Sequence, residues 1–157
     1  MAYNIFAVIV TYNPPGNLME RLKYVLKEVN KVIIVDNASQ QTTREVLQEA
    51  HTQFLNKIEI IHNEKNRGLA TALNQGIKNA LENGAEWVLM LDHDSKPEPG
   101  MIARMLSEYE AYPEKNKVGL IAPEIYEQNI VTPTRYLMPR GKYWFERCTL
   151  DVAYRDD

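Results

Sequence analysis

The stretch from Val32 to Val35 is apolar at every position, and it constrains the fold more than any other part of the chain. A strand with one face in water alternates polar and apolar residues, whereas a strand of a parallel sheet is covered by helices on both faces and reads as a continuous apolar run. Comparable short runs alternate with stretches whose apolar residues have helical spacing. The sequence therefore predicts an α/β fold with a mostly parallel sheet and right-handed crossovers.

The expected elements follow from these runs and from the turn residues between them. The predicted strands are Tyr3–Thr11, Val32–Val35, Ile58–Ile61, Trp87–Leu91 and Val118–Ala122. The predicted helices run from Asn17 to Val29, from a cap at Thr42 or Thr43 to Phe54, from Leu69 to Leu81, and from Met101 to Tyr109. Regular periodicity fades after Pro123.

Composition limits the possible functions. The chain has 157 residues, 45% of them hydrophobic, which is enough for a core of its own. A net charge of −3 provides no broad cationic face, so a nucleic-acid partner is not expected. The single Cys148 cannot form an internal disulfide, and no apolar run approaches the roughly 20 residues that span a bilayer. We expect a cytoplasmic protein without a transmembrane segment, and peripheral association with the inner face of the membrane stays open.

Polar residues gather where the predicted strands end. In open α/β sheets, ligands bind outside the carboxyl ends of the strands. The residues at these positions are Thr11-Tyr12-Asn13, Asp36-Asn37, Asn63–Gly68 and Asp92-His93-Asp94.

Asp92 and Asp94 are the strongest candidates for a metal site. In extended chain both side chains project to the same side, and a divalent cation such as Mg²⁺ or Mn²⁺ relieves their repulsion while binding substrate phosphates. The same alternation points His93 the other way, which favours a packing or hydrogen-bonding role for it. In the alternative interpretation Asp94 caps the following helix and Asp92 lies in solvent.

The other strand ends each allow two interpretations. Asp36 can contact a ribose or base, or form a turn with Asn37. Tyr12 can stack on a nucleobase, or form an aromatic rim. The Asn66-Arg67-Gly68 stretch can bind phosphate before a helix N-terminus, or serve as a plain loop and cap.

Four stretches, "AVIVTYNP", "VIIVDNAS", "NRGLATALNQGI" and "VLMLDHDSKPEPGMI", resemble the family 2 glycosyltransferases with the GT-A fold, and within them the rhamnosyltransferase-like group. They occur in the family's order within residues 5–125. The resemblance implies an inverting transfer of a sugar from a dTDP- or UDP-linked donor to a saccharide or lipid-linked acceptor, with Mg²⁺ or Mn²⁺ as cofactor.

The resemblance also implies roles for individual residues. Those implied to bind the nucleotide sugar are Thr11, Tyr12, Asn13, Asp36, Asn66, Arg67, Gly68 and Asp92. Asp94 is implied as the more direct metal ligand, with Asp92 beside it. Residues 1–123 would form the nucleotide-sugar-binding domain, and residues 124–157 a tail that begins an acceptor-binding half.

No general base is identified in this chain. Asp151, Asp156 and Asp157 are acidic but lie near the terminus, where side chains are usually solvated. Two rival functions stay open: a non-catalytic nucleotide-binding module, and a phosphatase or phosphotransferase in which Asp92 is the nucleophile. A P-loop and a GxGxxG motif after the first strand are both missing from the sequence, which argues against ATPase and NAD-dependent functions.

Overall fold

The computed structural model describes residues 3–14, 16–123, 136–140 and 144–148, the last two ranges as backbone only. The chain divides into two compact units, Met1–Ser107 and Glu108–Asp157. We describe each unit by itself.

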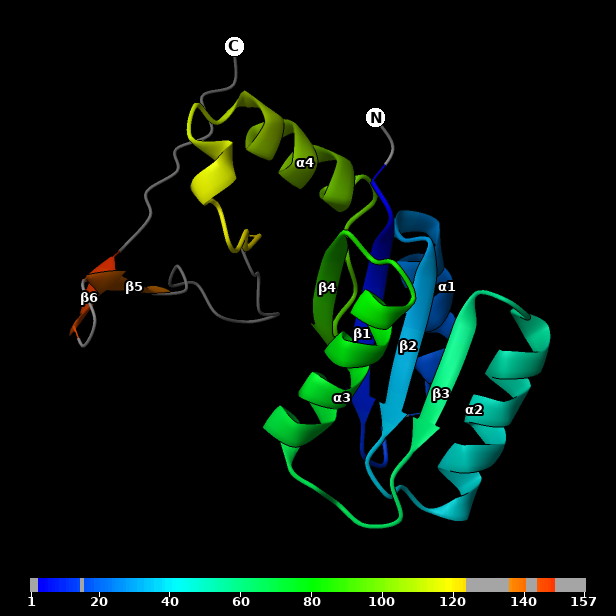
Figure 1. Ribbon diagram of the computed structural model, residues 1–157. Helices are drawn as coiled ribbons and strands as arrows, with labels where there is room; N and C mark the ends of the chain where they lie inside the picture. The colour runs from blue at the N-terminus through cyan, green and yellow to red at the C-terminus, as the bar shows by residue number, and fades with distance from the viewer. Residues whose placement is uncertain (1–2, 15, 124–135, 141–143, 149–157) are drawn as a thin grey trace. The chain divides into compact units, whose positions relative to one another are not determined.

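The first unit is an α/β layer structure with an all-parallel sheet, as the sequence predicts (Figure 1). Its strands are β1 (Ile5–Thr11), β2 (Lys31–Asp36), β3 (Ile58–His62) and β4 (Trp87–Asp92). Its helices are α1 (Leu18–Glu28), α2 (Gln41–Gln53), α3 (Leu69–Glu82) and α4 (Met101–Ala111), of which α4 runs into the second unit. The strand order is β3-β2-β1-β4.

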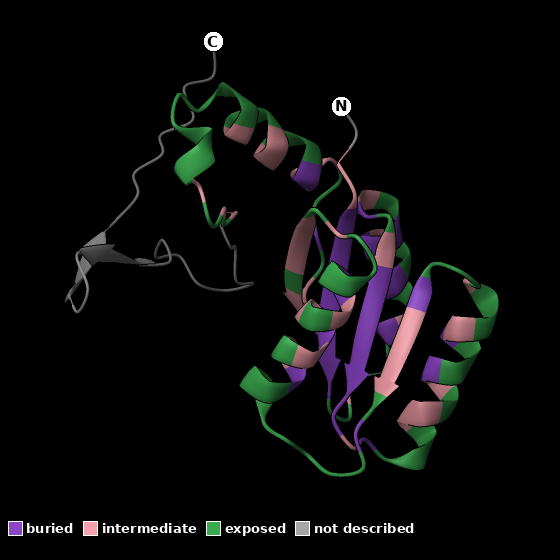
Figure 2. Ribbon diagram, in the orientation of Figure 1, coloured by how far each residue is buried: buried purple, intermediate pink, exposed green. Residues whose placement is uncertain are grey.

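The two central strands, β1 and β2, form the buried middle of the unit (Figure 2). Successive side chains of β1 point to opposite faces of the sheet. Ile5, Ala7 and Ile9 belong to the core that includes α1, α2 and the start of α4, whereas Val8 and Val10 pack with residues of α3. Helices therefore cover both faces, which explains why β2 has no polar residue between Lys31 and Asp36.

Helix α3 packs closely on the sheet through small residues on its inner face. Its fully buried positions are Ala72, Gly76 and Ala80, one helical turn apart. By contrast Leu69 and Leu81, two of the apolar residues that mark this helix in the sequence, are each 57% exposed. The sequence thus located the helix, but small residues rather than these two leucines make its central contact.

The predicted start of the second helix is wrong. Neither Thr42 nor Thr43 caps α2, which begins at Gln41 with Gln40 at the capping position and no side-chain cap. The backbone N–H of Gln40 donates to Asn13 Oδ1 at 2.8 Å, and its carbonyl accepts from the Thr43 and Arg44 amides. A contact with the β1–α1 loop therefore fixes where this helix begins.

The predicted fifth strand is also wrong, because residues 118–122 form no strand. Leu120 is 73% exposed, and no ladder partner is recorded for this segment among the described strands. An apolar run becomes a strand only where a neighbouring strand accepts its hydrogen bonds.

The second unit contains a short 3₁₀ helix, Lys115–Lys117, and an antiparallel pair of strands, β5 (Tyr136–Arg140) and β6 (Trp144–Cys148). Residues 124–135 and 149–157 of the predicted tail lie outside the described residues, as do Asp151, Asp156 and Asp157. The domain boundary after residue 123 stays a prediction. Within the described ranges, no helix combines the length and apolar character needed to cross a membrane.

Replacing Gly76 with alanine tests the close packing of α3. A Cβ at this position would lie 2.4 Å from Val8 Cγ1 and 3.1 Å from Val35 Cγ2. We expect Gly76→Ala to lower the free energy of unfolding by up to about 2 kcal/mol, which is the usual overpacking cost of about 1–3 kcal/mol less the roughly 1 kcal/mol by which alanine favours a helix. Urea unfolding measures this. Asn74→Ala, at an exposed position of the same helix, should not destabilise the protein.

Candidate functional site

The strand order places a ligand crevice between β1 and β4. From β1 the chain adds β2 and then β3 on one side, and it then returns to add β4 on the other side of β1. The crossover helix α3 packs on the opposite face from α1 and α2. At such a reversal of strand order, ligands commonly bind in a crevice outside the carboxyl ends of the strands.

The register brings the strand ends to one level. Thr11 lies opposite Asp36, Asp36 lies opposite His62, and Val10 lies opposite Asp92. The polar residues that follow the four strands are therefore neighbours in space although they are up to about 80 residues apart in the chain.

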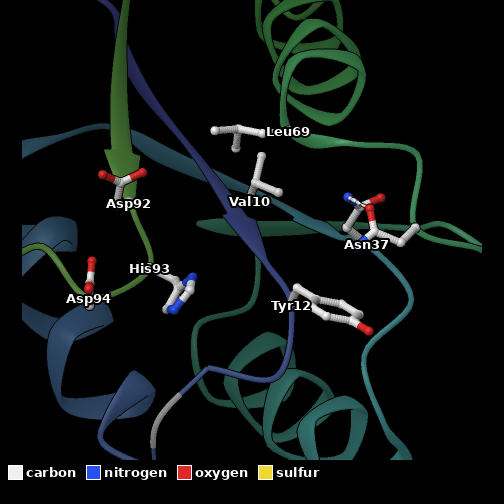
Figure 3. A pocket seen from close by; sticks show the side chains of 8 residues that line it. Val10, Tyr12, Asn37, Leu69, Asp92, His93 and Asp94 are labelled. Atoms are coloured by element: carbon white, nitrogen blue, oxygen red, sulfur yellow. Dashed lines mark hydrogen bonds between the residues drawn. The ribbon is translucent and has the colours of Figure 1, made fainter.

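A pocket of about 330 Å³ lies at this edge, within the size range of small-ligand sites. Its lining residues are Val10, Tyr12, Asn37, Asn66, Leu69, Asp92, His93 and Asp94. Figure 3 shows Asp92 and Asp94 on one side, Tyr12 and Asn37 on the other, and Val10 and Leu69 between them. The pocket thus has an acidic wall and an aromatic and amide wall, joined by an apolar floor.

The acidic wall is a turn rather than an extension of the strand. Strand β4 ends at Asp92, and the Ser95 amide donates to the Asp92 carbonyl at 3.0 Å. Both Asp92 and Asp94 are exposed and line the pocket. His93 lines it as well, so the expectation that this side chain points away is wrong, because strict alternation ends where the strand ends.

The two carboxylates fit a metal ion that is shared with a ligand. Across the described residues there is no group of three or more His, Cys, Asp or Glu side chains suited to holding a metal ion. A cage made of protein ligands alone is therefore not formed by these residues. Mg²⁺ is commonly held by one or two carboxylates, with substrate phosphates and water as its other ligands, and Asp92 and Asp94 match that arrangement.

The loop after β1 presents Tyr12 and uses its neighbours as supports. Tyr12 is 51% exposed at the pocket. Asn13 has a positive φ of 48°, its amide donates to Ser39 Oγ at 3.0 Å, and its side chain accepts from Gln40. Thr11 is fully buried, and its carbonyl accepts from the Asn37 amide at 2.8 Å. Neither Thr11 nor Asn13 lines the pocket, so their predicted contact with the nucleotide stays a prediction.

Side-chain amides hold the loop that precedes α3. Asn37, 3% exposed, donates to Asn66 Oδ1 at 2.9 Å and accepts from the Arg67 amide at 2.9 Å. Asn63, 5% exposed, donates to Asn37 Oδ1, and it forms two reciprocal hydrogen bonds with Gln75 of α3 at 3.0 and 3.1 Å. This amide cluster, formed by Asn37, Asn63, Asn66 and Gln75, ties the ends of β2 and β3 to α3.

The orientation of the Asn66 amide is set by its partners. Its Oδ1 accepts from both Asn37 and the Gly68 amide, the latter at 2.9 Å, so its Nδ2 group is the part left to face a ligand. Gly68 has a φ of 81°, which favours glycine, and it directly precedes α3. Arg67 is exposed and does not line the pocket. Its predicted phosphate contact stays a prediction.

Asp36 is not among the residues that line the pocket. The carboxylate is fully buried, and Oδ1 accepts from the Ser39 amide at 3.0 Å. Its Oδ2 lies 3.2 Å from His62 Nδ1 and 3.4 Å from Arg44 Nε. Both carboxylate oxygens thus contact protein groups. The contact with the Ser39 amide holds the β2–α2 loop. The predicted contact between Asp36 and a ribose or base stays a prediction.

Sequence reasoning missed four pocket-lining residues and two supports. Val10 and Leu69 appeared only as core residues, Asn37 appeared only as a turn partner of Asp36, and His93 was assigned to packing or hydrogen bonding. Asn63 and Gln75 had no assigned role. The only signal for them was the high amide content of residues 63–75, which does not by itself indicate which amides meet.

Comparison with known proteins agrees with this geometry. The family described as Glycosyl transferase family 2 matches residues 6–151. A dTDP-rhamnosyl transferase of Shigella flexneri, RfbF, is 40% identical over 97 residues, which are 61% of this chain and 31% of that protein. The galactofuranosyltransferase GlfT1 of Mycobacterium tuberculosis is 30% identical over 158 aligned positions, which cover 95% of this chain and 48% of that protein. The chain thus spans about half or less of the length of these relatives.

Truncating Asn63 tests the amide cluster. Asn63→Ala removes both hydrogen bonds between Asn63 and Gln75 and one of the two that Asn37 Oδ1 accepts, so we expect the free energy of unfolding to fall by about 1–3 kcal/mol. Hydrogen exchange at the Arg67 amide, which donates to Asn37, should become faster. Gln48→Ala removes an exposed amide from α2 and serves as the control. Unchanged stability and exchange in Asn63→Ala would mean that the cluster does not hold the loop.

Proposed function

Since the chain belongs to glycosyl transferase family 2, we propose that it forms the donor-binding part of a glycosyltransferase that moves a sugar from a nucleoside-diphosphate donor to a saccharide or lipid-linked acceptor. The observation that carries this proposal is the convergence of Asp92, Asp94, Tyr12 and Asn66 on one pocket at the β1–β4 crevice. A nucleoside diphosphate sugar has an aromatic base, hydroxyl groups and a pyrophosphate, and the two walls of the pocket offer groups suited to each.

In this proposal the aromatic and amide wall binds the nucleoside. The exposed ring of Tyr12 stacks on the base, a contact worth roughly 1–3 kcal/mol in nucleic-acid complexes. Asn66 Nδ2 donates to a carbonyl or hydroxyl oxygen of the nucleoside, because its Oδ1 is already engaged. Leu69 begins α3 and lines the pocket, so the N-terminus of that helix, which favours negative charge, is available to the phosphates.

The acidic wall binds the pyrophosphate end. In this proposal Asp92 would contact the ribose, and Asp94, with Asp92 beside it, would hold Mg²⁺ or Mn²⁺. When bound, the cation supplies Lewis-acid stabilisation of the charge that develops on the departing diphosphate. Without a cation, two carboxylates beside a pyrophosphate would repel it, so we propose that binding depends on metal.

The acceptor side lies beyond the residues assigned here. We propose inversion at the anomeric carbon, with an acceptor hydroxyl attacking as a carboxylate general base takes its proton. The similarity to a dTDP-rhamnosyl transferase supports a dTDP-linked deoxysugar such as dTDP-rhamnose as donor, and the similarity to a galactofuranosyltransferase keeps UDP-linked donors in the test. We place the reaction in the cytoplasm, with peripheral attachment where the acceptor is lipid-linked.

Calorimetry with dTDP and UDP in the presence of Mn²⁺ tests the donor site. We expect Asp92→Ala and Asp94→Ala each to weaken binding by about 10- to 100-fold, because each removes a charged group that binds the ligand or its metal. Glu98→Ala removes an exposed carboxylate from the same connection without touching the pocket, so it should bind as the wild type does. Binding that persists unchanged in both aspartate variants would refute the site.

Removing the metal gives a separate prediction. With EDTA in place of Mn²⁺, wild-type affinity for dTDP should fall to that of Asp94→Ala, and EDTA should change the affinity of Asp94→Ala little. The reason is that the carboxylate and the cation act as one unit in this proposal. Equal affinity for dTDP with and without Mn²⁺ would contradict metal dependence while leaving nucleotide binding intact.

A further inference from the structure

We propose that Arg21 of α1 is a positioning residue, which holds the acidic turn so that Asp94 presents its carboxylate to the metal and diphosphate. This inference rests on the proposed function. It concerns a residue outside the pocket that acts through the backbone of Asp94.

The acidic turn needs such support because the sheet provides little. Among the described strands, β4 pairs with β1 alone and is therefore an edge strand. Beyond Asp92 the chain leaves the ladder, and residues 93–100 form only turns and irregular structure before α4 begins. A segment with no ladder partner has to be fixed by side-chain contacts if its carboxylate is to keep one position.

Arg21 makes the contact nearest to the site. Its Nη1 donates to the backbone carbonyl of Asp94, and its Nε donates to Asn17 Oδ1 at 3.0 Å. The guanidinium is thus held at two points, as its rigid planar fork allows. Because it binds the carbonyl, the Asp94 carboxylate stays available to a ligand.

Two further contacts from the same helix continue along the connection. Lys96 Nζ lies 3.9 Å from the centroid of the Tyr24 ring, a cation–π contact. The Glu28 carboxylate accepts from the Gly100 amide at 2.8 Å and from the Ile102 amide at 3.4 Å, where α4 begins. A carboxylate at a helix N-terminus is favourable because it satisfies free amides and matches the helix dipole.

These contacts share one face of α1. Arg21, Tyr24 and Glu28 are three and four residues apart, which is the spacing of neighbours on a helix surface. The adjacent face of the same helix is buried through Leu22, Val25 and Leu26. Helix α1, which packs on the core, therefore contacts the connection between β4 and α4 through three side chains. Of these, Arg21 is the one that contacts Asp94.

The test uses the full chain with Mn²⁺ and dTDP as probes. We expect Arg21→Ala to weaken the Mn²⁺-dependent affinity for dTDP by about tenfold, within the range seen when groups that orient metal ligands are removed. Affinity measured in EDTA should not change. Hydrogen exchange at the Ser95 amide, which closes the turn on Asp92, should become faster. Exchange of the core amides of β1 should stay as in the wild type, showing that the fold is intact.

Lys23→Ala is the matched control, because it removes one exposed cation from the same helix on a different face. It should alter neither the affinity nor the exchange. Loss of affinity in Lys23→Ala equal to that in Arg21→Ala would mean that overall charge is responsible, and it would overturn the inference.

A double-mutant cycle separates positioning from direct contact. In the Asp94→Ala background, Arg21→Ala should cause no further loss of affinity, because the residue that it positions is gone. Additive losses would show that Arg21 contacts the ligand itself, and they would overturn the positioning role.

Failure of the proposed function is distinguishable from failure of this inference. If the wild type shows no Mn²⁺-dependent binding of dTDP, the donor site is refuted, and Arg21 cannot position a metal ligand. If the wild type binds but Arg21→Ala leaves both the affinity and the Ser95 exchange unchanged, the donor site stands and the positioning role is refuted.

Discussion

The parallel pairing of β1 with β2 on one side and β4 on the other is the constraint on which the site depends. Its register sets Thr11 beside Asp36 and Val10 beside Asp92, so three strands end at one level. Helices cover both faces of these strands, and this burial explains the apolar run from Val32 to Val35 in β2. The polar residues that follow the strands meet because the strands end together.

The two walls of the pocket are supported in different ways. The aromatic and amide wall follows central strands, and the amide cluster ties it to α3, which itself packs closely through Gly76. The acidic wall follows an edge strand and depends on contacts from α1. If the proposed function is correct, these separate supports would allow the proposed metal site to adjust without disturbing the proposed nucleoside site.

The chain belongs to glycosyl transferase family 2, and it covers about half or less of the length of the relatives compared above. Every residue of the pocket lies in the first unit, whereas no general base has been assigned. Donor binding is therefore the proposed property that can be tested with this chain alone. Transfer to an acceptor is a separate question, which the donor-site experiments do not need to answer.

The sequence by itself determined the α/β class, all four parallel strands, the helices between them and the acidic pair, because periodicity and strand-end residues are local signals. Predictions from the sequence were wrong where the local structure depends on contacts with distant parts of the chain. Val118–Ala122 is apolar but has no described strand beside it, and the start of α2 follows a contact with Asn13 rather than a threonine cap. Tertiary structure alone decided that Asp36 is buried under His62 and Arg44, that His93 joins the pocket, and that Arg21 reaches Asp94 across 73 residues. The physical reason is that a side chain's surroundings at a strand end come from distant loops, and no local pattern records which of those loops meet.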